Sequence, residues 1–120
     1  YLNLAGLAKA VNDLAHRART QQLKPEEVQE GTFTFTNIGN FGSLTGTPII
    51  SQPQVGIVAV GVIRKMPAVI ETSQGDSIAI RKKMIISISY DHRIINGAMG
   101  GKFIKSMSDY LENWDKDFSK

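Results

Sequence analysis

Hydrophobic and polar positions follow a helical period at the two ends of the chain. Over residues 2–22, Leu4, Leu7, Val11 and Leu14 recur at steps of three and four, which predicts an amphipathic helix. The polar side of this helix carries His16, which we expect to be solvated. Residues 98–114 repeat the helical period and predict a second helix whose apolar stripe packs on a core. That stripe comprises Met99, Phe103, Met107, Tyr110, Leu111 and Trp114.

Five segments between the two helices have patterns typical of strands. In residues 32–36 two phenylalanines alternate with three threonines, so one face is aromatic and the other is a row of hydroxyls. Residues 55–63 are apolar on both faces, as in a central strand. Residues 68–72 and 77–81 flank the turn-forming sequence SQGD and predict a hairpin, and residues 84–90 predict a further strand.

No charged residue occurs from Gly31 to Ile63, a stretch of 33 positions. The stretch is too rich in glycine and proline to span a membrane, and an uncharged loop of this length is uncommon on the surface of a monomer. We therefore expect residues 39–54 to be covered by another chain, or by a part of the protein outside this sequence. A polar surface loop, kept soluble by Asn, Ser, Thr and Gln side chains, is the alternative.

Composition excludes several classes of site. The 120 residues carry 14 Lys and Arg against 11 Asp and Glu, and the net charge of +3 is too small to indicate nucleic-acid binding. The absence of cysteine excludes disulfides and cysteine-bound metals, and two histidines are too few for a histidine-rich cluster. No apolar run approaches the roughly 20 residues of a membrane span. The length allows one domain, and a start without Met inside a helical pattern suggests a piece of something longer.

His92 is the main candidate for chemistry. It follows the apolar strand over 85–90 and precedes a glycine turn, a position at which sites are commonly built. Histidine side chains, with an unperturbed pKa of about 6.5, suit general-base catalysis near neutral pH. On extended backbone Asp91 and Arg93 point to one side and His92 to the other, so the charged pair can serve as structural partners. A histidine that only donates structural hydrogen bonds fits these three residues as well.

Asn96 lies four residues after His92 and directly before the second helix. It can cap that helix by accepting a hydrogen bond from a first-turn N–H group. It can also turn back toward His92 at Gly97, and the spacing permits both roles.

The segment Ser89–Ala98 (SYDHRIINGA) resembles the His-x-x-x-Asp-Gly signature of the dihydrolipoamide acyltransferases, the core components of the 2-oxo acid dehydrogenase complexes. Residues 10–15 with 23–27, residues 31–39 and residues 47–54 resemble the same family in the same order. The resemblance implies an α/β fold, a mixed β-sheet with flanking helices in a chloramphenicol acetyltransferase-like sandwich. The family's catalytic domain is longer than this chain, so residues 1–120 are expected to be its C-terminal half, a partial domain.

The resemblance also implies a reaction, in which an acyl group passes from an acyl-dihydrolipoyl arm to coenzyme A without a metal. The family's histidine, His92 here, removes the proton of the attacking thiol. Thr36, on the hydroxyl face, aligns with the family's donor to the tetrahedral oxyanion. Asn96 stands where the signature more often has Asp, so it can orient or hydrogen-bond but supplies no carboxylate. The residues that bind coenzyme A are not identified.

Partners and location follow from the same resemblance. The family forms homotrimers in which the histidine and the hydroxyl meet across an interface, larger cores built from trimers, and complexes with a 2-oxo acid decarboxylase and dihydrolipoamide dehydrogenase. Neither nucleic acid nor a membrane is expected as a partner. The expected location is the bacterial cytoplasm, or the mitochondrial matrix in a eukaryote. Residues 36–37 and 41–44 resemble succinyl- or branched-chain-transferring members and Asn96 resembles acetyl-transferring ones, which slightly favours the former.

Two other functions fit the sequence. A chloramphenicol acetyltransferase-like enzyme has a similar histidine motif but acylates a hydroxyl, and the segments 25–27 and 47–50 fit it less well. A non-catalytic scaffold or assembly fragment of the complex core belongs to a different class of protein, and it becomes a serious alternative if the chain is a half-domain.

Overall fold

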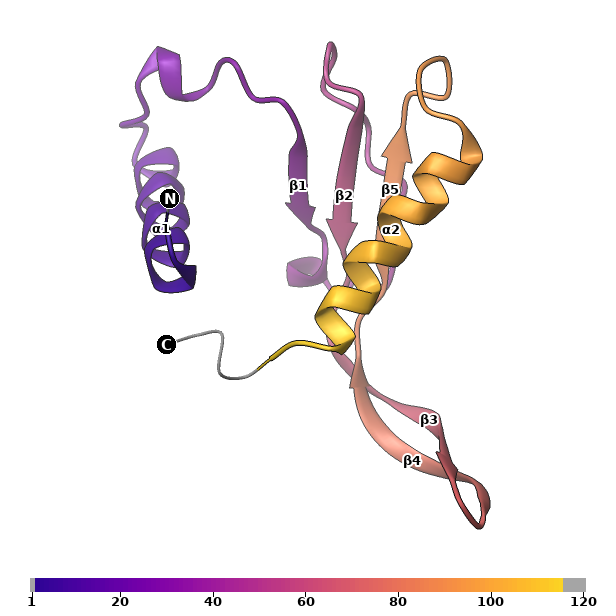
Figure 1. Ribbon diagram of the computed structural model, residues 1–120. Coiled ribbons are helices and arrows are strands. Elements are labelled where there is room, and N and C mark those ends of the chain that lie inside the picture. The colour runs from indigo at the N-terminus through magenta and orange to yellow at the C-terminus, as the bar shows by residue number, and fades with distance from the viewer. Residues whose placement is uncertain (1, 116–120) are drawn as a thin grey trace. The chain divides into compact units, whose positions relative to one another are not determined.

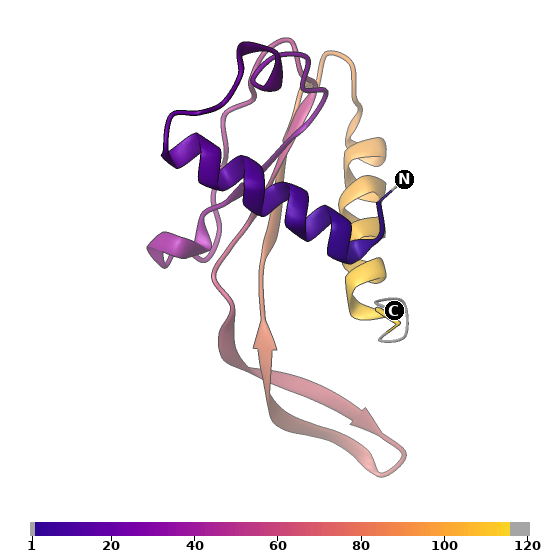
Figure 2. The same cartoon turned by 90° about the vertical axis from the view of Figure 1, so that its left-hand side faces the viewer.

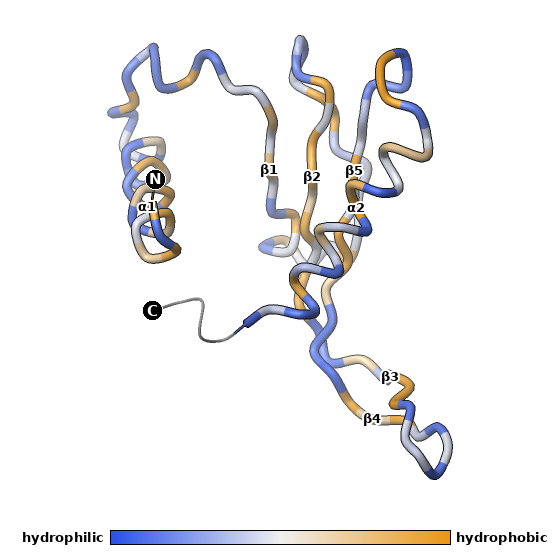
Figure 3. The backbone as a smooth tube through the Cα atoms, viewed as in Figure 1, coloured by the Kyte–Doolittle hydropathy of each residue, from blue (hydrophilic) through white to orange (hydrophobic). Residues whose placement is uncertain are grey.

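Strand β2 (Gly56–Val60) is the most buried element of this computed structural model, which describes residues 2–115. Its Ile57, Val58, Ala59 and Val60 form the buried hydrophobic core of the described chain. Figure 3 shows the strand as a hydrophobic segment between its two neighbours. The predicted central strand over 55–63 is therefore confirmed in position, although it ends at Val60.

A mixed sheet forms around β2. Strand β1 (Thr34–Asn37) runs parallel to it on one side, and β5 (Ile86–Tyr90) runs antiparallel on the other (Figure 1). The order β1-β2-β5 agrees with the mixed sheet that the family resemblance implied. Within the described residues both outer strands keep an open edge, which is available for pairing with another strand.

The two faces of this sheet differ in chemistry. The strand register places Thr34, Thr36, Ser87 and Ser89 on one face, as the alternation of residues 32–36 predicted for the threonines. Thr34 Oγ1 donates to Gln54 Oε1 over 2.5 Å, and the Thr45 and Ser87 hydroxyls lie 2.8 Å apart. Part of the uncharged stretch thus packs on the hydroxyl face.

The remainder of the uncharged stretch is open in a single chain. Phe41 and Ile49 are 92% and 91% exposed. A short 3-10 helix, η2 (Gly39–Phe41), leads into this segment, and Gly42 closes it with a φ of 80°. Exposed apolar side chains of this size leave room for the covering partner that the sequence predicts for residues 39–54.

Strands β3 (Arg64–Thr72) and β4 (Gly75–Lys83) form a hairpin that extends beyond the sheet (Figures 1 and 2). Both strands are longer than predicted. The turn is only two residues, so β4 begins early, at Gly75 with a φ of 113°, and at the opposite end of the hairpin the pairing continues to Arg64 and Lys83. The Gly61 N–H donates to the Ile85 carbonyl over 2.9 Å, so the β2–β5 ladder continues toward the hairpin.

Helix α2 (Gly97–Glu112) packs on the aromatic face of the sheet (Figure 1). The Phe33 and Phe103 rings lie 5.7 Å apart, and Gly100 is the buried residue of the helix. Much of the predicted apolar stripe remains open, since Met99 is 56% exposed and Tyr110 is 58% exposed. The expected packing of this stripe on a core is therefore only partly realised in the described chain.

The described residues divide into two compact units, residues 32–108 with the sheet, and residues 2–31 with 109–115. In the second unit, helix α1 (Leu4–Arg19) begins at Asn3, whose Oδ1 accepts from the Gly6 N–H over 2.8 Å. The apolar stripe of α1 is not covered, because Leu4, Leu7, Val11 and Leu14 are 41–62% exposed. His16 is exposed, as predicted.

The short helix η1 (Pro25–Glu27) is tied to α1 by charge. Arg17 Nη1 and Nη2 donate to the two Glu27 oxygens over 2.6 and 2.8 Å, and its Nε donates to Asp13 over 3.0 Å. The Lys24 N–H also donates to the Glu27 carboxylate, over 2.8 Å. These hydrogen bonds lower the pKa of Glu27 to about 2, with the Arg17 guanidinium as the largest cause.

Candidate active site

The turn after β5 presents His92. The Asp91 N–H donates to the Val55 carbonyl over 2.8 Å, which fastens the start of the turn to the segment before β2. The Asp91 carbonyl accepts from the N–H groups of Ile94 and Ile95 over 3.1 and 2.9 Å. His92 lies inside this bonded turn with an exposed side chain. A histidine in this setting has a fixed backbone and an imidazole that solvent or a substrate can reach.

Asp91 and Arg93 form an ion pair beside His92. The Asp91 carboxylate accepts from the Arg93 backbone N–H over 3.0 Å, and from its Nε and Nη2 over 3.0 and 2.9 Å. The Asp91 side chain is 17% exposed, whereas that of Arg93 is 82% exposed. Hydrogen bonds from the Arg93 side chain, followed by its backbone N–H, lower the pKa of Asp91. The pair therefore holds the conformation of the turn, and because residues 92–94 form a turn, the alternation expected for extended backbone does not apply to them.

Asn96 caps helix α2. Its Oδ1 accepts from the Met99 N–H over 2.9 Å, and its carbonyl accepts from the Gly100 N–H over 3.1 Å. Of the two roles that the spacing allowed, the structure contains the helix cap, which satisfies a first-turn donor. The cap fixes where α2 begins relative to the His92 turn.

Tyr90 touches His92, a contact that the sequence analysis did not anticipate. The two ring centroids lie 5.6 Å apart at an interplanar angle of 36°. Strand β5 ends at Tyr90 and His92 lies in the turn that follows, so strand alternation does not predict this contact, which depends on the conformation of the turn.

Thr36 is not brought to His92 within one chain. Thr36 is opposite Ala59 on β2, whereas Tyr90 is opposite Gly56 at the other end of that strand. With strand spacings of about 4.8 Å and a rise of about 3.3 Å per residue, the Cα atoms of Thr36 and Tyr90 lie roughly 14 Å apart. The His92 turn, with Asp91, Arg93 and Asn96, is local, and the hydroxyl expected to share its chemistry lies elsewhere on the sheet.

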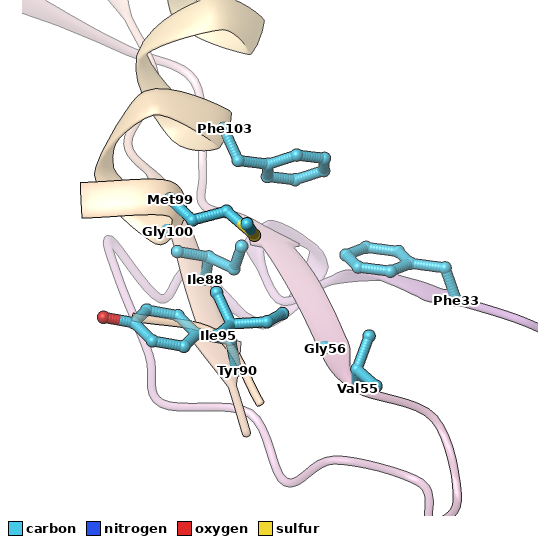
Figure 4. Close-up of a pocket in the computed structure, with 9 residues that line it drawn as sticks. All are labelled: Phe33, Val55, Gly56, Ile88, Tyr90, Ile95, Met99, Gly100 and Phe103. Atoms are coloured by element: carbon cyan, nitrogen blue, oxygen red, sulfur yellow. The ribbon is translucent and has the colours of Figure 1, made fainter. Parts of the chain in front are cut away.

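An apolar cavity of about 230 Å³ lies between the sheet and α2, next to this turn (Figure 4). It is lined by Phe33, Val55, Gly56, Ile88, Tyr90, Ile95, Met99, Gly100 and Phe103. Among the described residues no cluster of three or more His, Asp or Glu side chains is arranged to hold a metal ion. Nor does any helix in this part of the chain have the length and apolarity needed to cross a membrane.

The mixed sheet with flanking helices agrees with the acyltransferase fold that the sequence resemblance implied. Residues 1–118 match the family described as 2-oxoacid dehydrogenases acyltransferase (catalytic domain), and the chain belongs to this family.

Two curated relatives represent two kinds of acyl transfer. The chain is 46% identical to the acetyltransferase component of the pyruvate dehydrogenase complex of Corynebacterium glutamicum, covering 92% of this chain and 16% of that protein. It is 40% identical to the succinyltransferase component of the 2-oxoglutarate dehydrogenase complex of Bacillus subtilis, covering 93% of this chain and 26% of that protein. The chain thus spans a small part of the curated relatives it matches.

Solved structures share the fold. The cubic core of a pyruvate dehydrogenase multienzyme complex matches with a TM-score of 0.84 at 32% identity, over 93% of this chain and 44% of that one. The dihydrolipoamide acetyltransferase of Azotobacter vinelandii matches with a TM-score of 0.80 at 32% identity, over 89% and 42%. A serine, a histidine and an asparagine were investigated there for their role in the catalytic mechanism. Its histidine and asparagine are four residues apart, as are His92 and Asn96.

Proposed function

We propose that this chain is the C-terminal half of a dihydrolipoamide acyltransferase catalytic domain and contributes His92 to acyl transfer between a dihydrolipoyl arm and coenzyme A. The observation that carries the proposal is the bonded turn over 91–95, which presents an exposed imidazole four residues before the cap of α2. Membership of the family and the equal histidine-to-asparagine spacing in the Azotobacter vinelandii enzyme support it.

The chemistry needs one base and one hydrogen-bond donor. His92 takes the proton from the thiol of coenzyme A, and the resulting thiolate attacks the carbonyl carbon of the acyl-dihydrolipoyl thioester. The Thr36 hydroxyl donates to the oxygen that becomes negative in the tetrahedral intermediate. Collapse breaks the bond to the dihydrolipoyl sulfur, which receives the proton from the imidazolium. Coenzyme A and the dihydrolipoyl group are both substrates, and Asn96 and the Asp91–Arg93 pair hold the turn from which His92 acts.

The site is shared between copies of the chain in this proposal. The separation of roughly 14 Å between Thr36 and Tyr90 supports it, because one copy alone does not place the hydroxyl beside the imidazole. The exposed Phe41 and Ile49, within the uncharged stretch, supply apolar area for an interface. A homotrimer is the proposed unit, with larger cores of the kind that the cubic-core relative forms. The decarboxylase and dihydrolipoamide dehydrogenase components are the further proposed partners, and the bacterial cytoplasm is the proposed location.

Which acyl group the protein transfers is a separate question. The relatives include an acetyltransferase component at 46% identity and a succinyltransferase component at 40% identity. The preference for succinyl or branched-chain groups, argued from residues 36–37 and 41–44, stays a prediction. Rates of transfer to dihydrolipoamide from acetyl-, succinyl- and isobutyryl-coenzyme A would rank the three directly.

The decisive experiment replaces the proposed base. His92→Ala should lower thiol-dependent acyl transfer by a factor of about 10² to 10⁴, the usual contribution of a general base. His16→Ala is the matched control, because it removes the chain's other histidine from an exposed helix surface and should leave the rate unchanged. A His92→Ala variant that transfers acyl groups at the parent rate would remove His92 from the mechanism.

A second function, that of a scaffold fragment, is favoured by two observations. The single chain does not bring Thr36 and His92 together, and it spans less than half of the solved catalytic chains it matches. Calorimetric titration with coenzyme A separates the two functions, because a scaffold has no need to bind it. Acetylation of chloramphenicol instead of dihydrolipoamide would point to the third alternative, an O-acetyltransferase.

A further inference from the structure

We propose that Tyr90 is a positioning residue for His92, and that its aromatic ring holds the imidazole in the orientation needed for proton transfer. The inference rests on the proposed function, in which His92 is the base.

The contact is between two aromatic rings. Their centroids lie 5.6 Å apart at 36°, inside the range of about 4.5 to 7 Å in which aromatic pairs attract. Within the described part of the chain, no hydrogen bond or ion pair reaches the His92 side chain. The imidazole is instead paired with the aromatic ring of Tyr90. The backbone of the turn fixes where the histidine begins, and the tyrosine ring restricts where its imidazole goes.

Helix α2 in turn fixes the tyrosine. A Cβ atom built on Gly100 would lie 2.5 Å from Tyr90 Cε1 and 2.7 Å from its Cζ, so the ring lies directly against the helix backbone. Gly97 is also close, with a built Cβ at 3.9 Å from the Tyr90 hydroxyl oxygen. The ring is thus wedged between the end of β5 and the first turns of α2. The capped helix thus restrains the Tyr90 ring, and the Tyr90 ring in turn restrains the His92 imidazole.

The ring, not the hydroxyl, carries this function. Figure 4 shows the Tyr90 oxygen directed away from the apolar side chains that line the cavity, whereas the ring lies alongside them. A phenylalanine at this position keeps every contact that the proposal uses. A leucine fills part of the same space but removes the aromatic face on which the imidazole rests.

The experiment compares Tyr90→Leu with Tyr90→Phe and uses Phe103→Leu as a matched control. Phe103 lines the same cavity and loses the same kind of ring, but its ring partner is Phe33 rather than His92. The first readout is the set of ring proton and carbon resonances of His92, assigned through a His92→Gln variant. The second readout is kcat and KM for coenzyme A in the assembled protein.

Tyr90→Leu is expected to shift the His92 resonances and to lower kcat about ten-fold, with KM changed little, because misplacing a catalytic group slows the chemical step more than binding. Tyr90→Phe should restore both readouts, and Phe103→Leu should move neither. Resonances that do not move in Tyr90→Leu would overturn the proposal, and so would an equal response to Phe103→Leu or an unchanged kcat. If His92→Ala itself is fully active, the proposed function fails instead, and the resonances still report whether the rings are in contact.

Discussion

Single residues around His92 combine structural and chemical roles. Asp91 uses its carboxylate to bind the Arg93 backbone and guanidinium, and Asn96 uses its amide oxygen to cap α2. Each of these polar groups is committed to the conformation of the turn before any substrate arrives. Substitutions here are therefore expected to alter stability as well as rate, and the two effects need separate measurements.

Asn96 offers a clean separation of the two effects. Asn96→Ala removes the acceptor for the Met99 N–H and should lower the free energy of unfolding by about 1 kcal/mol. Asn96→Asp keeps an acceptor at the same place and should unfold with nearly the parent stability. Urea unfolding followed by circular dichroism measures both. Equal stability of the alanine variant and the parent would show that this cap contributes little.

At the scale of elements, an ion pair stabilises the contact between helices α1 and η1. The Arg17–Glu27 pair links the two helices, and it lowers the pKa of Glu27 from 4.5 to about 2. A carboxylate whose pKa is lower in the folded state stabilises that state when ionised. The stabilisation is complete above the unfolded pKa and is lost as the pH falls toward 2.

The pH dependence of unfolding should reveal this pair. Between pH 4.5 and 2, Glu27→Gln is expected to lose less stability than the parent, because it has no carboxylate to protonate at this position. Glu26→Gln is the control, since Glu26 lies beside Glu27 in η1 but has no recorded ion pair among the described residues. Parallel curves for the Glu27→Gln variant and the parent would contradict the coupling of η1 to α1.

Packing between β5 and α2 gives a second test at the scale of elements. Gly100→Ala places a methyl group 2.5 Å from the Tyr90 ring and should destabilise the protein by about 1 to 3 kcal/mol. Gly101→Ala, one position along, meets nothing within 4 Å and should be stabilising by up to about 1 kcal/mol through helix propensity. Thermal unfolding of the two variants compares their stabilities directly. Stability changes of the same sign in both variants would show that the Tyr90 ring moves aside at little cost.

Much at this scale could be predicted from local pattern. Both helices follow from periodicity, the buried strand β2 follows from a continuous apolar run, and the turn at His92 follows from a short stretch of sequence. The hairpin was underestimated because its far end carries Arg64, Lys65, Lys82 and Lys83, where charged residues do not continue the apolar alternation that marks a strand. The exposure of β1 was also not predictable: Phe35 is 63% exposed while Thr36 is half-buried, because residues 43–54 fold over the hydroxyl face.

Prediction of the candidate site from local sequence pattern has the same limit. Asp91, Arg93 and Asn96 lie within four residues of His92, so their proximity is local and readable from the sequence. The distance of Thr36 depends on how β1 and β5 align on β2, and strand register across a sheet is not encoded in a short motif. The family resemblance supplied the expected role of Thr36 and its meeting with the histidine across an interface, and the strand register agrees with that expectation by placing Thr36 away from the His92 turn.

The whole molecule, as a single chain, is incomplete by several measures. Among residues 2–115, both outer strands of the sheet have open edges, α1 and α2 leave apolar stripes exposed, and Phe41 and Ile49 face outward. Separation of the proposed base and oxyanion donor on one sheet belongs with these features. In the proposed function, the other half of the catalytic domain and further copies of the chain would cover these surfaces.

Mixing two inactive variants tests directly whether each site is shared between two copies of the chain. Copies with His92→Ala retain Thr36, and copies with Thr36→Val retain His92, so mixed assemblies can form intact sites while neither pure variant can. Co-expression of the two variants should recover a substantial fraction of the parent rate. A mixture no more active than its better component would show that each site is built within one copy.

The placement of Thr36 and His92 at opposite ends of β2 has a genetic consequence. If each site draws its hydroxyl from one copy and its imidazole from another, a chain defective in both disables sites on two neighbours at once. In a cell that makes defective and normal chains in equal amounts, only about a quarter of the sites would join two normal chains. Co-expressed defective chains would then lower activity below the half that dilution of the normal chains alone predicts.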